Sequence, residues 1–254
     1  MAKVHFTLQG KGGVGKSLVS ALIAQHRAEY SIPQICIDTD PVNATFAGYT
    51  AFDVKRVELM KNNKIDEAEF DRLMELIAEN PESEIVIDNG ASSFIPLSNY
   101  LVENQAVELL QSMGHQIFVH PVITGGQALK DTVTGFDTLA NQFPESAEMV
   151  VWLNMYFGAV EFEGKSFEQM KAYTNHKSRV NGIITIPKQS DLFDRDVKAM
   201  LESRMTFDQA MQSDKFNFMS KNRLRMMKEH LWQQMDLILG VPVQGKKEKT
   251  ANVD

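Results

Sequence analysis

The sequence predicts an α/β fold, a doubly wound and mostly parallel β-sheet flanked by helices. Two observations support this prediction. Short, almost continuous apolar runs alternate with segments of helical spacing, as in sheets whose strands are buried on both faces. A glycine-rich loop of the phosphate-binding pattern stands between the first apolar run and the first helical segment.

Six β-rich apolar runs are the expected strands: 4–8, 34–39, 84–88, 116–122, 149–153 and 182–186. Between them, apolar side chains spaced three and four residues apart predict helices over 17–30, 65–80, 97–113, 126–142 and 162–177. Strands joined through helices pair in parallel, with right-handed connections in nearly all known cases. The alternation therefore predicts one wound sheet.

A long helix is expected near the end of the chain, up to Gly240. Its apolar positions step by three or four residues and are expected to pack on the core: Leu224, Met227, Leu231, Met235 and Ile238. No linker rich in Gly, Pro and Ser divides the sequence, so we expect residues 1–240 to form a single domain. Residues 241–254 hold almost nothing apolar to bury and are expected to form a disordered polar tail.

Length and composition exclude several classes of protein. The chain has 254 residues, 43% hydrophobic and 23% charged, unlike a collagen-like or wholly disordered chain. The single cysteine, Cys36, excludes an intrachain disulfide and a CxxC pair, and it fits a reducing cytoplasm. No apolar run reaches the roughly 18 residues of a membrane-spanning helix. We therefore expect a cytoplasmic protein without membrane insertion.

The formal net charge of −7 is unevenly distributed along the sequence. Residues 58–84 hold nine acidic and three basic side chains, whereas residues 215–249 hold eight basic and three acidic ones. The overall charge excludes a chain that coats nucleic acid wholesale. The basic segment 215–249 leaves two interpretations open: non-specific contact with DNA phosphates, or a solvated helix face, which we favour.

Residues 10–17, GKGGVGKS, satisfy the phosphate-binding pattern G-x-x-x-x-G-K-[ST]. Glycines let the backbone wrap closely around an oxyanion, and the start of the following helix adds partial positive charge. Lys16 is expected to neutralise the β- and γ-phosphates, and the Ser17 hydroxyl to bind Mg²⁺. The loop residues expected to bind the nucleotide are Gly10, Lys11, Gly12, Gly13, Val14, Gly15, Lys16, Ser17 and Leu18.

A lysine directly after the first glycine, here Lys11, marks the deviant Walker A motif. In KGGVGKS the sequence resembles the ParA/MinD/nitrogenase-iron-protein group of P-loop ATPases. The resemblance implies binding of ATP with Mg²⁺ and slow ATP hydrolysis. It also implies a homodimer across two nucleotides, in which Lys11 reaches the phosphates bound by the partner subunit. Lys11, Lys16 and Asp40 are then the implied catalytic residues.

Two further strand ends match the family's motifs. In IDTDP, Asp38 and Asp40 point the same way. The resemblance implies that Asp40 orients the attacking water and contacts Mg²⁺ through water, while Asp38 supports the site. Asp88 ends the Walker B run IVID and is implied to assist Mg²⁺ through another water. Many relatives have a proline where this sequence has Gly90, at a position that senses the γ-phosphate. The resemblance therefore does not determine the rate of ATP hydrolysis.

The base pocket is inferred from two residues. Asn154 follows the strand MVVWL, where the family has an asparagine that hydrogen-bonds adenine. Pro187 ends the strand GIITI, where relatives close over the base. No aspartate lies in 155–157, so the guanine-reading pattern NKxD is absent. A turn-forming role for Asn154 at the strand end is the alternative.

Longer segments narrow the resemblance to one branch. The sequence shares HFTLQGKGGVGKS, DTDPVNATF and IDNGASSFIPL with the TraL family of conjugal-transfer proteins of broad-host-range plasmids. This resemblance implies a role in plasmid transfer or maintenance, and a protein partner in the transfer or partition machinery. Two alternatives stay open: a nucleotide-binding adaptor with negligible hydrolysis, and a P-loop metabolic ligase of the dethiobiotin-synthetase type.

Overall fold

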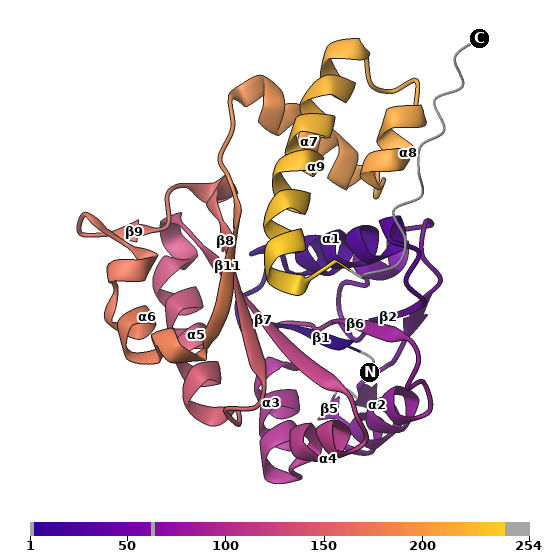
Figure 1. Cartoon of the computed structure of the whole chain (residues 1–254), viewed down its shortest axis with the longest axis vertical. Helices are drawn as coiled ribbons and strands as arrows, with labels where there is room; N and C mark the ends of the chain where they lie inside the picture. The colour runs from indigo at the N-terminus through magenta and orange to yellow at the C-terminus, as the bar shows by residue number, and fades with distance from the viewer. Residues whose placement is uncertain (1–2, 62–63, 242–254) are drawn as a thin grey trace.

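The computed structural model describes residues 3–61 and 64–241 of the chain. Its central sheet has seven strands in the order β11-β8-β7-β1-β6-β2-β3, with helices on both faces (Figure 1). Every pairing in this sheet is parallel. The strands are β1 (Lys3–Leu8), β2 (Gln34–Asp38), β3 (Val54–Arg56), β6 (Glu84–Asp88), β7 (Gln116–Thr124), β8 (Glu148–Asn154) and β11 (Val180–Ile186). The predicted α/β fold is confirmed.

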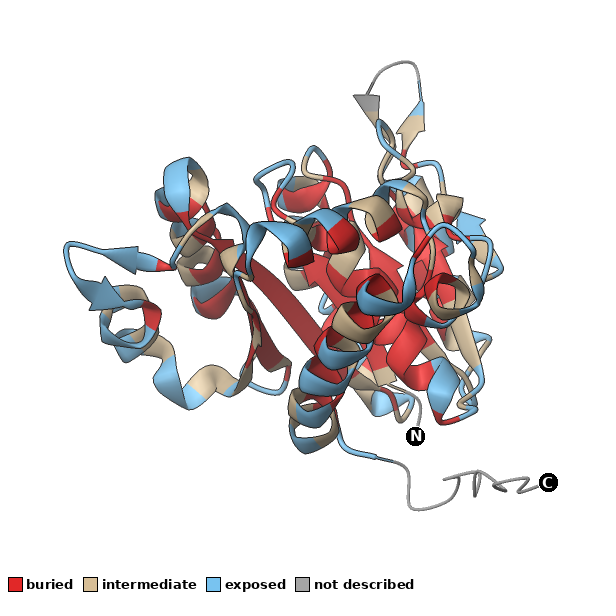
Figure 2. Cartoon of the chain, turned by 90° about the horizontal axis from the view of Figure 1, so that it is seen from above, coloured by how far each residue is buried: buried red, intermediate tan, exposed pale blue. Residues whose placement is uncertain are grey.

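Helices pack on the sheet through two separate apolar clusters. One face carries α1 (Lys16–Glu29), α7 (Asp191–Glu202), α8 (Phe207–Gln212) and α9 (Phe218–Leu239). The other carries α2 (Ala68–Ala78), α3 (Phe94–Glu103), α4 (Ala106–Ser112) and α5 (Leu129–Gln142), with α6 (Lys171–His176) against α5. The strands between these layers are buried, whereas the outer helix faces are exposed (Figure 2). This explains why the strand sequences are apolar at almost every position.

All six predicted strands lie in the sheet, with ends within two residues of those expected. The seventh strand, β3, was not predicted. It is three residues long, and Lys55 and Arg56 are exposed, so it leaves no apolar pattern in the sequence. Two short hairpins outside the main sheet were also missed: β4 (Met60–Lys61) with β5 (Lys64–Ile65), and β9 (Glu161–Phe162) with β10 (Lys165–Ser166).

Two helix predictions are wrong in part. The segment 162–177 begins with the β9–β10 hairpin, whose turn residues Glu163 and Gly164 both have positive φ angles, of 50° and 74°. Only α6 at its end is α-helical. The segment 97–113 is divided between α3 and α4, because Gln105 takes a left-handed φ of 51°. Apolar spacing alone does not reveal such interruptions.

The long C-terminal helix is confirmed as α9. Leu224, Met227, Leu231 and Met235 are buried against the sheet, as predicted. The side chain of Gln234 also bonds to the outermost strand, β11. Its Oε1 accepts a hydrogen bond from Thr185 N at 2.8 Å, and its Nε2 donates to Thr185 O at 3.1 Å. The predicted polar tail lies outside the described residues from position 242 onward.

None of the described helices combines the length and the apolar character needed to cross a membrane. Cys36 is buried in the core as expected, and burial raises the pKa of its thiol to about 12.

A buried chain of polar side chains crosses the sheet beneath α1. Trp152 Nε1 donates to His120 Nδ1 at 3.0 Å, so the other nitrogen of a neutral His120 carries the proton. That nitrogen lies 2.9 Å from His5 Nδ1, and His5 Nε2 lies 3.4 Å from Glu84 Oε2. Because indole can only donate, all the hydrogen bonds of this chain run in one direction and end at Glu84.

Burial keeps the histidines of this region neutral. Burial lowers the pKa of His5 and of His26 to about 4, and it lowers that of His120 well below its ordinary value. Below pH 6.5, therefore, these histidines bind protons in the unfolded chain but stay neutral in the native chain. We expect each of these histidines to lower the free energy of unfolding as the pH drops from 6.5 toward 4, by on the order of 3 kcal/mol for His5 alone, whereas Asp88, whose pKa is raised to about 7, acts in the opposite direction.

Urea denaturation at a series of pH values measures this loss. His26→Gln is expected to flatten the slope, since it removes one of the shifted groups. His230→Gln, at an exposed position on α9, is the matched control and is expected to leave the slope unchanged. A His26→Gln chain whose stability depends on pH in the same way as that of the wild-type chain would contradict the prediction.

Candidate functional site

The glycine-rich loop lies between β1 and α1, at the carboxyl edge of the sheet. Gly13 and Gly15 have φ angles of 74° and 104°, in the left-handed region that favours glycine. Gly15 is the N-cap of α1, and no side chain caps that helix end. The first N–H groups of α1 are therefore open to an anion bound in the loop.

Lys16 is the first residue of α1, and only 7% of its surface is exposed. Its Nζ donates a hydrogen bond to the Lys11 carbonyl oxygen at 3.0 Å, which holds the ammonium over the loop. Burial lowers the pKa of Lys16, while the charges of Asp88 and Asp40 act in the opposite direction. The loop thus holds a buried ammonium group. An anionic ligand would offset the free-energy cost of removing that group from water.

Asp38 and Asp40 shape the loop that follows β2. Asp38 accepts hydrogen bonds from the backbone N–H groups of Asp40 at 3.0 Å and Ala47 at 2.9 Å. Asp40 Oδ1 accepts hydrogen bonds from the backbone N–H groups of Val42 and Asn43, which leaves the second carboxylate oxygen available to a ligand. Asp38 is the last residue of β2, and its hydrogen bond from Asp40 N fixes the backbone position of Asp40.

Asp88 ends β6 and is 1% exposed. Ser20 Oγ donates to its Oδ1 at 3.3 Å, but its buried Oδ2 has no hydrogen-bond partner within residues 3–61 and 64–241. Burial raises the pKa of Asp88 to about 7, against the effects of Ser17 and Lys16. An orphaned carboxylate oxygen beside Ser17 suits a water-mediated cation contact.

Gly90 is needed for the approach of two loops. A Cβ atom at this position would lie 2.9 Å from the Cγ of Asp40 and 3.0 Å from its Cα. The loop after β6 therefore packs directly against the Asp40 loop, and Thr39 Oγ1 donates to Asn89 Oδ1 at 3.1 Å between them. A side chain at position 90 would therefore force these two loops apart.

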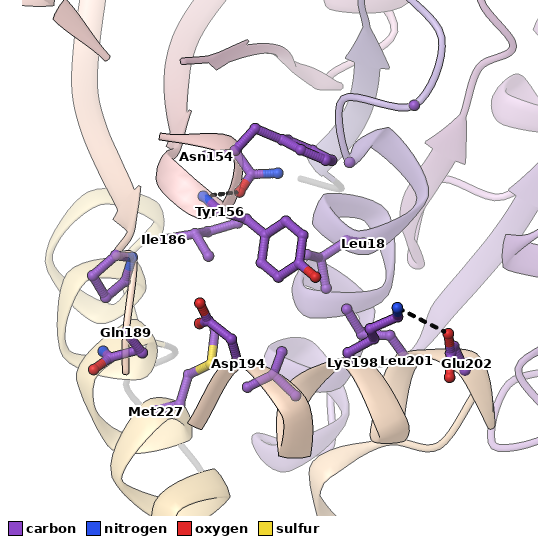
Figure 3. A pocket seen from close by; sticks show the side chains of 15 residues that line it. Leu18, Asn154, Tyr156, Ile186, Gln189, Asp194, Lys198, Leu201, Glu202 and Met227 are labelled. Atoms are coloured by element: carbon purple, nitrogen blue, oxygen red, sulfur yellow. Dashed lines mark hydrogen bonds and ion pairs between the residues drawn. The ribbon is translucent and has the colours of Figure 1, made fainter. Parts of the chain in front are cut away.

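Two adjoining cavities lie over the loop. The larger, of about 570 Å³, is lined by Lys16, Ser17, Asp40 and the loop glycines. The smaller, of about 240 Å³, lies between β11, α7 and α9 and is shown in Figure 3. They share lining residues, namely Gly13, Gly15, Leu18 and Leu201. The first is charged and the second mostly apolar, as a phosphate chain and a base would require.

Asn154 and Pro187 both line the smaller cavity. The amide of Asn154 is engaged within the chain: Nδ2 donates to Val14 O at 2.9 Å, and Oδ1 accepts from Tyr156 N at 3.2 Å. The side chain is buried and touches the loop, because a Cβ at Gly15 would lie 2.7 Å from Nδ2. Asn154 thus holds the loop against β8, and its predicted contact with adenine stays a prediction.

The sequence reasoning missed the α7 wall of this cavity, with Gln189 and Asp194. A signal was available. Ser190 precedes a segment in which Phe193, Val197 and Met200 are spaced as on one helix face. These three side chains are buried in the structure.

Lys11 points away from its own phosphate cavity. Its Nζ forms an ion pair at 2.8 Å with Asp131, in the first turn of α5, and both side chains are about half exposed. An exposed pair of this kind contributes little stability, roughly 0–1 kcal/mol, so it is easily exchanged for another anion.

The basic side chains of α9 are largely paired within the chain. Arg223 lies 2.6 Å from Asp196, and Lys228 lies 2.6 Å from Glu29 and 2.8 Å from Asp208. Arg225 forms a looser pair with Glu229 at 3.5 Å. In the described part of 215–249, these pairs neutralise much of the positive charge that the sequence displays.

Comparisons with known proteins identify the family. No protein-family model matches the chain. Protein TraL of Escherichia coli is 54% identical over 237 residues, which cover 93% of this chain and 98% of the relative. A second Protein TraL of Escherichia coli is 52% identical over the same length. The chain belongs to the TraL family.

Solved structures confirm the fold. MinD in the MinC:MinD cell division protein complex of Aquifex aeolicus matches with a TM-score of 0.51 at 13% identity, over 92% of this chain and 96% of that one. The MinD cell division protein of Aquifex aeolicus matches with a TM-score of 0.50 at 14% identity, over 92% and 98%. The TraL family therefore shares the fold of MinD, as the resemblance in the glycine-rich loop predicted.

Proposed function

We propose that this chain binds ATP with Mg²⁺ and forms a homodimer across the nucleotide, as a switch protein of plasmid conjugal transfer or maintenance. One observation carries the proposal. The buried Lys16, the Ser17 hydroxyl and the Asp40 carboxylate face one cavity over an uncapped helix start, and an apolar cavity adjoins it. This is the arrangement that a triphosphate attached to a flat base requires.

The residues present fit a magnesium ion. Ser17 would bind it directly, and Asp40 and Asp88 would hold its waters, with the unpartnered oxygen of Asp88 directed to one of them. No group of three or more His, Cys, Asp or Glu side chains within 3–61 and 64–241 could hold a metal alone. Mg²⁺ in nucleotide sites is typically bound by one or two side chains together with phosphates and water. Its chemistry there is neutralisation of phosphate charge.

The chain's own residues would do the remaining work by position and charge. Lys16 neutralises the β- and γ-phosphates, and Asp40 orients the water that attacks the γ-phosphate. Lys11 would leave Asp131 and reach the phosphates of the second subunit when the dimer forms. The contact of Gly90 with Asp40 links this water-orienting residue to the loop after β6.

Family membership supports the biological setting. The relatives carry the name TraL, and we infer a role in conjugal transfer with a protein partner from the transfer or partition machinery. The MinC:MinD complex provides an example of a protein of this fold bound to a partner. We further propose that residues 1–240 act as one nucleotide-binding domain in the cytoplasm. DNA contact through 215–249 has less support, because the cations of α9 are largely paired within the chain.

The proposal predicts a dimer that depends on nucleotide. With ATP and Mg²⁺, size-exclusion chromatography with light scattering is expected to show a shift from monomer to dimer. Lys16→Ala is expected to block the shift, and Lys11→Ala to weaken it without loss of ATP binding. Lys171→Ala, at an exposed position on α6, is the control and is expected to dimerise normally. A wild-type chain that stays monomeric at saturating ATP would refute the dimer.

Single-turnover ATP cleavage distinguishes the two alternative functions. Bound ATP that is not cleaved, with or without plasmid DNA, would indicate a nucleotide-binding adaptor. Turnover that rises many-fold with a small carboxylic acid would indicate a ligase of the dethiobiotin-synthetase type.

A further inference from the structure

The smaller cavity contains one carboxylate and one amide side chain that the described part of the chain leaves unengaged. Asp194, in the first turn of α7, points its carboxylate toward the middle of the cavity (Figure 3). Gln189 lines the cavity near it, from the segment after β11. Neither side chain forms a hydrogen bond or an ion pair with any residue in 3–61 or 64–241. These two groups are therefore open to a ligand.

The other charged and amide side chains of the cavity are already engaged. Asn154 bonds to Val14 O and Tyr156 N. At the rim, Lys198 and Glu202 form an ion pair with each other at 3.7 Å. Besides the Tyr156 hydroxyl, a polar side-chain contact with a base in this cavity therefore falls to Asp194 and Gln189.

The chemistry of a carboxylate limits what Asp194 can meet. An ionised carboxylate only accepts hydrogen bonds, so its partner must be a donor. The cavity walls around it are apolar, from Leu18, Tyr156, Ile186 and Val197, and they suit a flat ring. The cavity opens to the phosphate cavity at Gly13 and Gly15, so the ring belongs to the base of a nucleotide.

We infer that Asp194 accepts a hydrogen bond from the exocyclic amino group of a purine base, and that Gln189 pairs with the adjacent ring edge. The inference rests on the proposed function, because it assigns the base end of the same nucleotide. Adenine offers its 6-amino group beside a ring acceptor, and guanine its 2-amino group beside a ring N–H. In either case the carboxylate selects a purine that has the amino group over one that lacks it.

Pairs of nucleotides that differ only in this group provide the test. Equilibrium binding with Mg²⁺ is measured for ATP against purine riboside triphosphate, and for GTP against inosine triphosphate. The wild-type chain is expected to bind ATP about 10- to 100-fold more tightly than purine riboside triphosphate, the usual effect of a hydrogen bond to a charged group. In Asp194→Ala, the two are expected to bind with equal affinity.

Two further variants control for the fold. Asp191→Ala removes another acid from the first turn of α7, at an exposed position outside the cavity lining, and is expected to keep the wild-type discrimination. Asp194→Asn keeps the shape and one acceptor oxygen but loses the charge. Its preference for ATP over purine riboside triphosphate is expected to be weaker than that of the wild-type chain. This variant keeps the inference testable if Asp194→Ala does not fold.

The outcomes separate this inference from the proposed function. A preference for GTP over inosine triphosphate, lost in Asp194→Ala, would support the role of Asp194 while correcting the identity of the nucleotide. Equal discrimination in wild type and variant would overturn the inference, and so would an equal loss of affinity for all four nucleotides, which would place the carboxylate on the sugar. Failure of the wild-type chain to bind any of the four would refute the proposed function itself.

Discussion

Replacing Lys16 with alanine is expected to weaken ATP binding about 100-fold or more, since each charged hydrogen bond to a phosphate contributes about 1.5–3 kcal/mol. The free energy of unfolding without nucleotide is expected to stay within about 1 kcal/mol of wild type. The lysine is buried and its pKa is lowered by burial, so its removal also relieves a desolvation cost. Isothermal titration calorimetry and urea denaturation measure the two quantities.

Lys11→Ala is the informative comparison for this variant. Both lysines belong to the same loop, but Lys11 is about half exposed and paired with Asp131 outside the phosphate cavity. Lys11→Ala is expected to change the affinity of a monomer for ATP less than threefold, since the proposed contact of Lys11 is with the second subunit. If Lys16→Ala binds ATP as tightly as wild type, the glycine-rich loop is not the phosphate site.

Replacing Arg27 with alanine is expected to destabilise the chain by about 3–5 kcal/mol, the usual cost of removing one member of a buried ion pair. Arg27 is fully buried and lies 3.0 Å from Glu84. It also donates to the carbonyl oxygens of Leu239 at 3.1 Å and Gly240 at 2.9 Å, at the end of α9. The variant removes the guanidinium partner of the buried Glu84 carboxylate and of the Gly240 carbonyl. His5 still contacts Glu84, and Lys3 still donates to Leu239 O.

Urea denaturation followed by circular dichroism measures this loss. Arg225→Ala is the matched control: its pair with Glu229 is exposed, and its removal is expected to cost less than about 0.5 kcal/mol. Arg27→Met combined with Glu84→Gln removes both charges and is expected to cost less than the sum of the single changes. A loss below 1 kcal/mol in Arg27→Ala would show that Glu84 is satisfied by His5 and Lys3 instead.

The strands and the phosphate loop could be predicted from the sequence because their signals are local. A strand buried on both faces must be apolar throughout, as IVID and MVVWL are, and glycines at fixed spacing are needed for the backbone of the loop. The β9–β10 hairpin was included in a predicted helix because Phe167, Met170 and Tyr173, which follow its turn, step by three residues as on one helix face. Only the positive φ angles of Glu163 and Gly164 distinguish the turn, and a glutamate gives no sign of such a conformation.

The base end of the site could not be predicted, because it depends on which segments meet in space. Asn154 has the expected position, but its amide is engaged by the loop and by Tyr156. Asp194 reaches the cavity from a helix far along the chain, and an aspartate in the first turn of a helix ordinarily indicates only a favourable helix dipole. Its carboxylate has no partner among residues 3–61 and 64–241, a property that depends on the three-dimensional packing of the cavity walls.

The contact between Gln234 and Thr185 has a consequence for how copies of the chain can associate. The outermost strand of an open sheet offers unpaired N–H and C=O groups to which a strand of another molecule can add. Here the Gln234 amide satisfies both backbone groups of Thr185, one residue before the end of β11, much as a neighbouring strand would. At the opposite edge, β3 is only three residues long. Strand addition is thus opposed at Thr185 on one edge and limited to three residues on the other, so copies of the chain have little edge on which to pair by extending the sheet.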